Sequence, residues 1–138
     1  MSAGSRERGA TTAAKGERGM TDGQQFAVTL ERPAEGVAVV VLEGEVDLYT
    51  APRFKDVLLQ AIDEGARHVI VDLAGVSFVD STALGVLVSG GKRLQQTAGG
   101  LAIGCPDAKI RRILEITGLD TVFGVYPSRD EALAAGKA

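Results

Sequence analysis

The sequence has the size and composition of one ordinary domain, and little in it favours nucleic acid or a membrane. Its 138 residues are enough to bury one hydrophobic core, and a formal net charge of −3 gives no positive field to attract nucleic acid. Only 4% of the residues are aromatic, which leaves few surfaces for base stacking. No apolar run approaches the roughly 20 residues that cross a bilayer.

The two ends of the chain differ in character. Residues 1–23 combine small residues with alternating charges and have almost no large apolar side chains, so we expect a disordered tail without a signal sequence. Residues 24–138 are expected to form one domain. Cys105 is the only cysteine, which favours the reducing cytoplasm, and we expect it to be a small apolar filler at a strand end.

The first half of the domain predicts a hairpin, a helix and a buried strand. Alternating apolar residues from Phe26 to Leu30 and the β-branched run VAVVVLEG predict an antiparallel pair. Thr50 is the expected N-cap of the following helix, and Gly65 is expected to end it. HVIVDL, extended through VSFV, predicts a strand over residues 68–79.

The second half alternates helices with short strands. STALGVLVSGGKRLQQTAGG, DAKIRRILEITG and SRDEALAA predict helices, while LAIGC and VFGVY predict strands. GVLVSGGKR lacks the spacing and the final Ser or Thr of a phosphate-binding P-loop. We therefore expect Gly90 and Gly91 to thin their helix for close packing.

This order of elements predicts an α/β fold with a mixed sheet of four to five strands. One edge strand is antiparallel, the rest are parallel because strand–helix–strand units cross over right-handed, and about four helices pack against the sheet. The carboxyl ends of the strands then bring the loops 43–50, 79–82 and 104–107 to one edge. Asp47 and Ser81 should lie on that edge, where ligands and partners tend to bind.

The residue types at this edge do not indicate catalysis. A serine nucleophile needs a base within reach, and the only histidine, His68, begins a strand far before Ser81. The sequence has no G-x-S-x-G motif and no set of metal ligands at a useful spacing. We expect no enzyme activity, no cofactor and no metal.

The stretch VDSTALG leaves two interpretations of its serine open. Asp80 or Ser81 is a helix cap and nothing more, or the Ser81 hydroxyl accepts a phosphate. A helix N-terminus tolerates an added anion, while the roughly −1.5 to −2 charges of a phosphate would change any surface formed with Asp80 and Asp47.

Three stretches resemble one bacterial family, the stand-alone STAS-domain anti-sigma factor antagonists. They are GEVDLYTAPRFK (44–55), VIVDLAGVSFVDSTALGVLV (69–88) and ILEITGLDTVF (113–123), within a resemblance that covers about residues 25–135. The resemblance implies a STAS-like fold and a partner-switching role in transcription regulation and stress response. The unmodified protein would bind an anti-sigma factor that is itself a serine kinase, and so release a sigma factor.

The resemblance also implies the site residues. The kinase would phosphorylate Ser81, with Thr82 as the second candidate, and a metal-dependent serine phosphatase would reverse the step. The partner interface would comprise Asp47, Asp80, Ser81, Thr82 and Ala83. Ala83 departs from the family, which usually has glycine there, and its methyl group is expected near the approach of the kinase.

Two other roles stay open on the sequence. The chain could be a STAS-type scaffold subunit of a larger stress-sensing or membrane-associated complex, in which Ser81 is only a cap. It could also be a small enzyme with Ser81 as nucleophile. We expect the protein neither to bind nucleic acid directly nor to insert into a membrane.

Overall fold

Five strands form one sheet whose spatial order follows the order of the chain. The computed structural model describes residues 26–136, and the tail predicted at 1–23 lies outside them, as do residues 24–25 and 137–138. The strands are β1 (Phe26–Ala34), β2 (Val37–Val46), β3 (His68–Val79), β4 (Gly100–Gly104) and β5 (Gly124–Tyr126).

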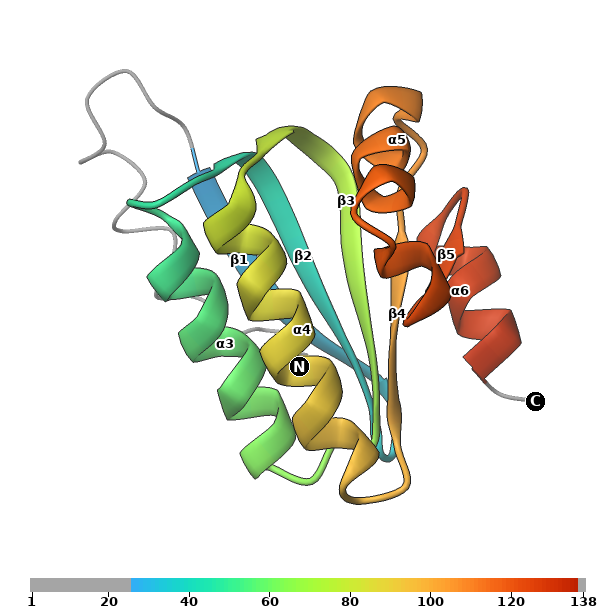
Figure 1. Ribbon diagram of the computed structural model, residues 1–138. Helices are drawn as coiled ribbons and strands as arrows, with labels where there is room; N and C mark the ends of the chain where they lie inside the picture. Colours follow the sequence, from blue (N-terminus) through green and yellow to red (C-terminus); the bar gives the residue numbers. More distant parts are fainter. Residues whose placement is uncertain (1–25, 137–138) are drawn as a thin grey trace.

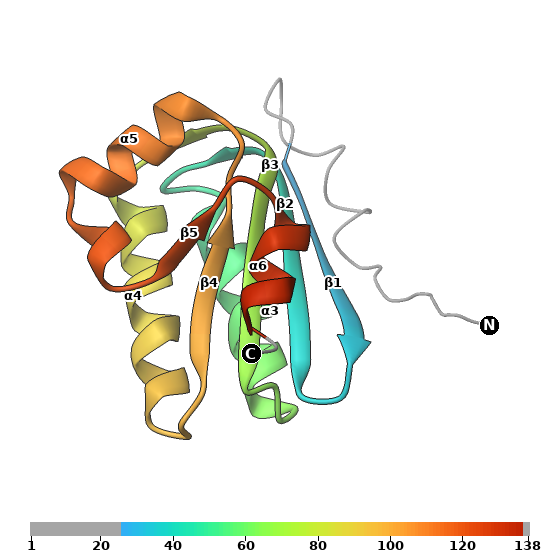
Figure 2. The same cartoon turned by 90° about the vertical axis from the view of Figure 1, so that its right-hand side faces the viewer.

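Helices cover both faces of this sheet, as Figures 1 and 2 show. On one face α3 and α4 run side by side, α5 lies near the end of the sheet at which α4 begins, and α6 lies on the opposite face. In residues 26–136 no helix is both long and apolar enough to cross a membrane. The bounds are α3 (Ala51–Asp63), α4 (Ser81–Gln95), α5 (Ala108–Ile116), the 3₁₀ turn η2 (Leu119–Thr121) and α6 (Arg129–Gly136).

The strand directions confirm the predicted fold class. The edge strand β1 is antiparallel to β2, whereas β2, β3, β4 and β5 are parallel to their neighbours. Each parallel pair is joined by a helical crossover, which is the arrangement that strand–helix–strand units require. The carboxyl ends of β2, β3 and β4 therefore point to one edge of the sheet.

The alternation within the strands divides the core between the two faces. Ala38, Val40 and Leu42 of β2 belong to the large core beneath α3 and α4, whereas Val39 and the neighbouring Ile70 of β3 pack with Ala132 of α6. Successive strand residues point to opposite faces, so a run of apolar residues such as VAVVVL predicts a strand that is buried on both.

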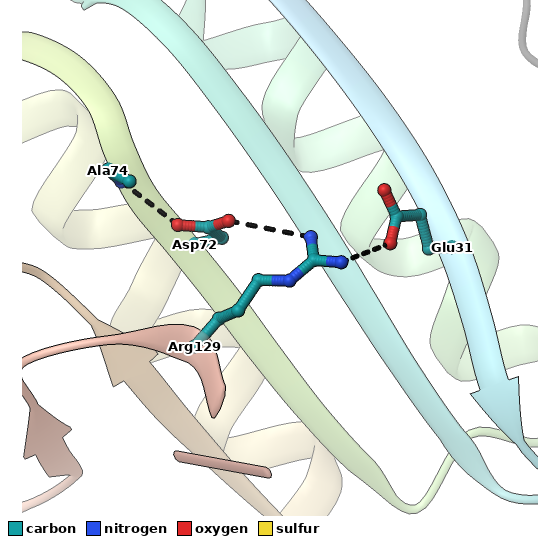
Figure 3. Close-up of polar contacts among 4 residues, drawn as sticks. All are labelled: Glu31, Asp72, Ala74 and Arg129. Atoms are coloured by element: carbon teal, nitrogen blue, oxygen red, sulfur yellow. Dashed lines mark hydrogen bonds and ion pairs between the residues drawn. The ribbon is translucent and has the colours of Figure 1, made fainter. Parts of the chain in front are cut away.

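A charged contact fastens α6 to the second face, as Figure 3 shows. Arg129, the first residue of α6, donates a hydrogen bond from Nη2 to Glu31 Oε1 of β1 at 2.7 Å, and its Nη1 lies 3.5 Å from Asp72 Oδ2 of β3. The other carboxylate oxygen of Asp72 accepts a hydrogen bond from Ala74 N at 3.0 Å. The buried Asp72 carboxylate is thus paired on both sides, which limits the cost of burying its charge.

The two glycines in the middle of α4 allow the close packing that the sequence predicts. A methyl group at Gly91 would lie 2.3 Å from Phe123 Cε1, and one at Gly90 would lie 2.5 Å from Leu58 Cδ2. Both distances are below van der Waals contact, so α4 approaches α3 and Phe123 more closely than an alanine would allow. Gly85 of the same helix has nothing within 4 Å of such a methyl group.

We therefore expect Gly91→Ala to destabilise the protein although alanine favours helices. Overpacking against Phe123 should lower the free energy of unfolding by about 1–2 kcal/mol, net of a helix gain of up to about 1 kcal/mol. The matched control Gly85→Ala should leave stability unchanged or raise it. Urea denaturation followed by circular dichroism measures both, and equal effects of the two substitutions would contradict the packing argument.

Cys105 is buried directly after β4, as predicted for an apolar filler. Burial raises the pKa of its thiol, and the thiol donates a hydrogen bond to Asp107 O at 3.5 Å. Because the reactive form of cysteine is the thiolate, both the burial and the raised pKa oppose reaction.

The native protein should therefore react very slowly with a thiol reagent at pH 8 and rapidly in urea. Cys105 is the only cysteine, so the whole absorbance change of a disulfide-exchange reagent reports on this thiol. A native rate equal to the rate in urea would show that the β4 end opens freely.

Candidate functional site

The carboxyl ends of β2 and β3 lie side by side and bring two predicted loops together. Val46 and Val79 are register partners in the parallel pair, and Asp80 N donates a hydrogen bond to Val46 O at 3.2 Å. Figure 1 shows this end of the sheet at the top, where β3 leads directly into α4. Asp47 and Ser81 therefore lie on the same edge of the domain, as the strand order predicts.

Asp80, and not Ser81, caps α4. Asp80 Oδ1 accepts hydrogen bonds from Thr82 N at 2.9 Å and from Ala83 N at 3.1 Å, which satisfies two of the unpaired N–H groups at the helix start. Ser81 is the first residue of α4 and is exposed. Within residues 26–136 its hydroxyl has no hydrogen-bond partner, so the hydroxyl is not needed to hold the helix.

The next two residues of α4 turn inward to different degrees. Thr82 is half-buried, whereas Ala83 is only 2% exposed and belongs to the main core. The predictions that Ala83 contacts a partner and that its methyl group faces an approaching kinase are therefore wrong. The third residue of a helix that starts at Ser81 points toward the sheet, which places the methyl group among core side chains.

The loop after β2 is held by Asp47 and Thr50 together. Asp47 Oδ1 accepts hydrogen bonds from Tyr49 N at 2.9 Å and from Thr50 N at 3.1 Å. Thr50 precedes α3 as predicted, but its side chain does not cap the helix, because its hydroxyl donates to Glu45 O at 2.8 Å and accepts from Asp47 N at 2.9 Å. The buried Thr50 thus ties the turn back to β2.

The loop after β4 also contains an aspartate that accepts backbone hydrogen bonds, but β4 ends before β2 and β3 do. Asp107 Oδ1 accepts from Lys109 N at 2.7 Å and so caps α5. The last residue of β4, Gly104, pairs with Asp72, whereas β3 continues beyond that point to Val79. The edge is therefore stepped, and the loops of β2 and β3 project beyond the loop of β4.

The geometry around Ser81 does not provide a nucleophile with its base. His68 is the first residue of β3, and Ser81 follows the opposite end of that strand, so imidazole and hydroxyl are separated by the length of β3. In the part of the chain that the structure describes, no three His, Cys, Asp or Glu side chains gather as metal ligands would. An exposed hydroxyl at a rigid helix start can instead be modified or contacted from outside.

Three large apolar residues at this edge are exposed, and we did not predict them as functional. Leu48 and Tyr49 lie in the turn after Asp47, and Phe78 lies two residues before Asp80. Phe78 lies two residues after the buried Val76, a spacing that in a regular strand would place Phe78 on the same buried face. A register shift between Gly44 and Glu45 of β2 gives β3 one extra residue there, which turns Phe78 outward.

Comparison with known proteins identifies the family of the chain. The STAS domain model matches residues 32–132. An anti-sigma-B factor antagonist of Staphylococcus epidermidis is 41% identical over 86 residues, which cover 62% of this chain and 80% of that protein.

Solved structures agree with this assignment. An anti-sigma factor antagonist from Mycobacterium paratuberculosis has a TM-score of 0.72 at 30% identity, covering 83% of this chain and 96% of that one. The anti-sigma factor antagonist SpoIIAA in its unphosphorylated form has a TM-score of 0.68 at 25% identity, covering 78% of this chain and 93% of that one. The chain belongs to the STAS domain family, among its anti-sigma factor antagonists, which are regulators and not enzymes.

Proposed function

We propose that this antagonist binds an anti-sigma factor through the edge formed by the β2 and β3 loops, and that phosphorylation of Ser81 blocks the binding. The observation that carries the proposal is that Asp80 and Ser81 have separate roles at the start of α4. Asp80 makes the capping hydrogen bonds, whereas the Ser81 hydroxyl is exposed. A kinase can therefore reach the hydroxyl, and its modification leaves the cap in place.

The surroundings of Ser81 explain why a phosphate would change binding. The N–H groups of Thr82 and Ala83 already donate to Asp80, so these two groups are not free to bind a phosphate on Ser81. The added charges would stand beside the Asp80 carboxylate. Burying such a dianion in an interface without a cation costs several kcal/mol, and about 3 kcal/mol corresponds to a loss of about two orders of magnitude in affinity.

Ser81 is a better acceptor than Thr82 on the same geometry. Thr82 is half-buried and its N–H is part of the cap, whereas Ser81 is exposed and precedes the capped groups. The relative SpoIIAA has been solved in its unphosphorylated form, which is a form distinguished by its phosphorylation state.

The proposed cycle needs two further activities, both supplied by partners in the cytoplasm. The anti-sigma factor acts as the kinase: the Ser81 oxygen bonds to the γ-phosphorus of ATP, the bond to ADP breaks, and the hydroxyl proton passes to a base of the kinase. A metal-dependent serine phosphatase hydrolyses the phosphate ester and restores the binding form.

The central prediction concerns the phosphorylated protein itself. Each ATP-binding anti-sigma factor of the source genome is purified, titrated calorimetrically with the wild-type chain, and then incubated with it in Mg-ATP. We expect one of them to bind, to phosphorylate Ser81 as mapped by mass spectrometry, and to bind the phosphorylated chain about 100-fold more weakly.

Three variants complete that experiment. Ser81→Ala should bind as wild type does and take up no phosphate, Ser81→Asp should bind more weakly than wild type, and Thr82→Ala should still be phosphorylated. Equal affinity of the phosphorylated and unmodified chains would overturn the regulatory part of the proposal. Failure of the wild-type chain to bind any anti-sigma factor would overturn all of it.

A second prediction separates the cap from the charge of Asp80. Asp80→Ala removes both capping hydrogen bonds and should lower the free energy of unfolding by about 1 kcal/mol. Asp80→Asn keeps an oxygen that can accept these bonds, and Ser81→Ala leaves them untouched, so both should unfold close to wild type in urea. A destabilisation by Ser81→Ala as large as that by Asp80→Ala would show that the serine is itself part of the cap.

A further inference from the structure

Exposed apolar side chains concentrate at the edge that carries Ser81. Among residues 26–136, five large apolar side chains are exposed, and three of them lie within four residues of Asp47 or Asp80. Leu48 is 61% exposed, Tyr49 77% and Phe78 48%. We call these three residues the apolar trio. Apolar groups gathered in this way on a monomer mark a surface that another molecule covers.

The backbone holds the apolar trio outward. Leu48 and Tyr49 lie in the turn that Asp47 and Thr50 close with hydrogen bonds to Tyr49 N, Thr50 N and Glu45 O. Phe78 is turned outward by the extra residue of β3 opposite Glu45. Because hydrogen bonds fix these backbones, little conformational freedom is lost when a partner covers the side chains.

The charges next to the apolar trio are mostly negative. Glu43 and Glu45 are exposed on β2, and Glu45 is the register partner of Phe78. Asp47 and Asp80 complete what we call the acidic rim. The segments from Glu43 to Pro52 and from Leu73 to Gly91 contain no Lys or Arg. The next cation along the chain, Arg53, lies with its guanidinium 5.6 Å from the centre of the Phe26 ring, on the register partner of Gly44. A partner that covers the trio must therefore meet carboxylates at its border.

We propose that the apolar trio is the centre of the contact with the anti-sigma factor, and that the anti-sigma factor meets it with an apolar depression bordered by Lys or Arg side chains that face Glu43 and Glu45. This inference rests on the proposed function, since it takes the anti-sigma factor as the partner. Two copies of this chain are a poorer match, because their acidic rims would be brought together.

This arrangement also explains how Ser81 acts on the contact. Glu43 and Glu45 lie on β2, whereas Ser81 lies at the start of α4, three residues after Phe78. A phosphate there stands at the margin of the apolar centre, where a close contact excludes water, and not opposite the cations that face the glutamates. The serine therefore controls a contact whose strength comes from the trio.

The test uses the full chain and the anti-sigma factor that binds it in the calorimetric screen. The double variant Leu48→Ser/Tyr49→Ser and the single variant Phe78→Ser should each weaken binding about tenfold to a hundredfold, because buried aromatic and aliphatic residues dominate contact energies. Val122→Ser is the matched control: Val122 is 53% exposed but lies just before the amino end of β5, away from the Ser81 edge, and its variant should bind as wild type does.

The charge part is tested by the rate of association. Glu43→Lys/Glu45→Lys should slow association and remove most of its dependence on salt, while Glu35→Lys, in the turn between β1 and β2 at the other end of the sheet, should change neither. Circular dichroism and the melting temperature of each variant show that it is folded; a trio variant that fails to fold is replaced by Leu48→Ala, Tyr49→Ala or Phe78→Ala.

The outcomes separate this inference from the proposed function. If trio variants bind within twofold of wild type, the inference is overturned while the function stands. If wild type binds and trio variants weaken binding but phosphorylation does not, the inference stands and control by Ser81 falls. If wild type self-associates in sedimentation and trio variants do not, the trio contacts a second copy and the inference is overturned, as it is if wild type binds no anti-sigma factor.

Discussion

The parallel pairing of β2 with β3 is the constraint on which the rest of this molecule depends. It sets Val46 beside Val79 and joins them through the hydrogen bond from Asp80 N to Val46 O. Two loops that are far apart in sequence thereby share one edge, and both stand beyond the shorter β4. Parallel strands need a helical crossover, so the same pairing also determines that α3 and α4 begin at that edge.

Each of the three loops at the carboxyl ends of β2, β3 and β4 contains an aspartate that accepts backbone N–H groups. Asp47 closes the turn before α3, Asp80 caps α4 and Asp107 caps α5. Carboxylates stabilise helix starts through hydrogen bonds and the helix dipole, so these three charges have a structural role before any partner is considered. At α4 the consequence is that the neighbouring hydroxyl of Ser81 is released from a structural role.

Adjacent residues at this edge thus differ sharply in burial. Ala83 packs into the core within the same turn in which Ser81 is exposed, and Phe78 is exposed one residue before the buried Val79. The core side of this edge fixes the backbone, and the fixed backbone presents a hydroxyl, apolar side chains and carboxylates to the outside. Modification of an exposed side chain on such a surface leaves the core contacts that fix the backbone in place.

The sequence by itself determined the class of the fold, the order of its elements and the edge that Asp47 and Ser81 share, because these follow from hydrophobic periodicity and from the handedness of crossovers. It also singled out Asp47, Asp80 and Ser81. It did not assign the cap to Asp80, the buried position to Ala83, the inward hydroxyl to Thr50 or the exposure to Phe78. Those depend on one extra residue in β3 and on the residue at which α4 begins, and a shift of one position moves a side chain to the opposite face. Only the tertiary pairing of β2 with β3 decides that position.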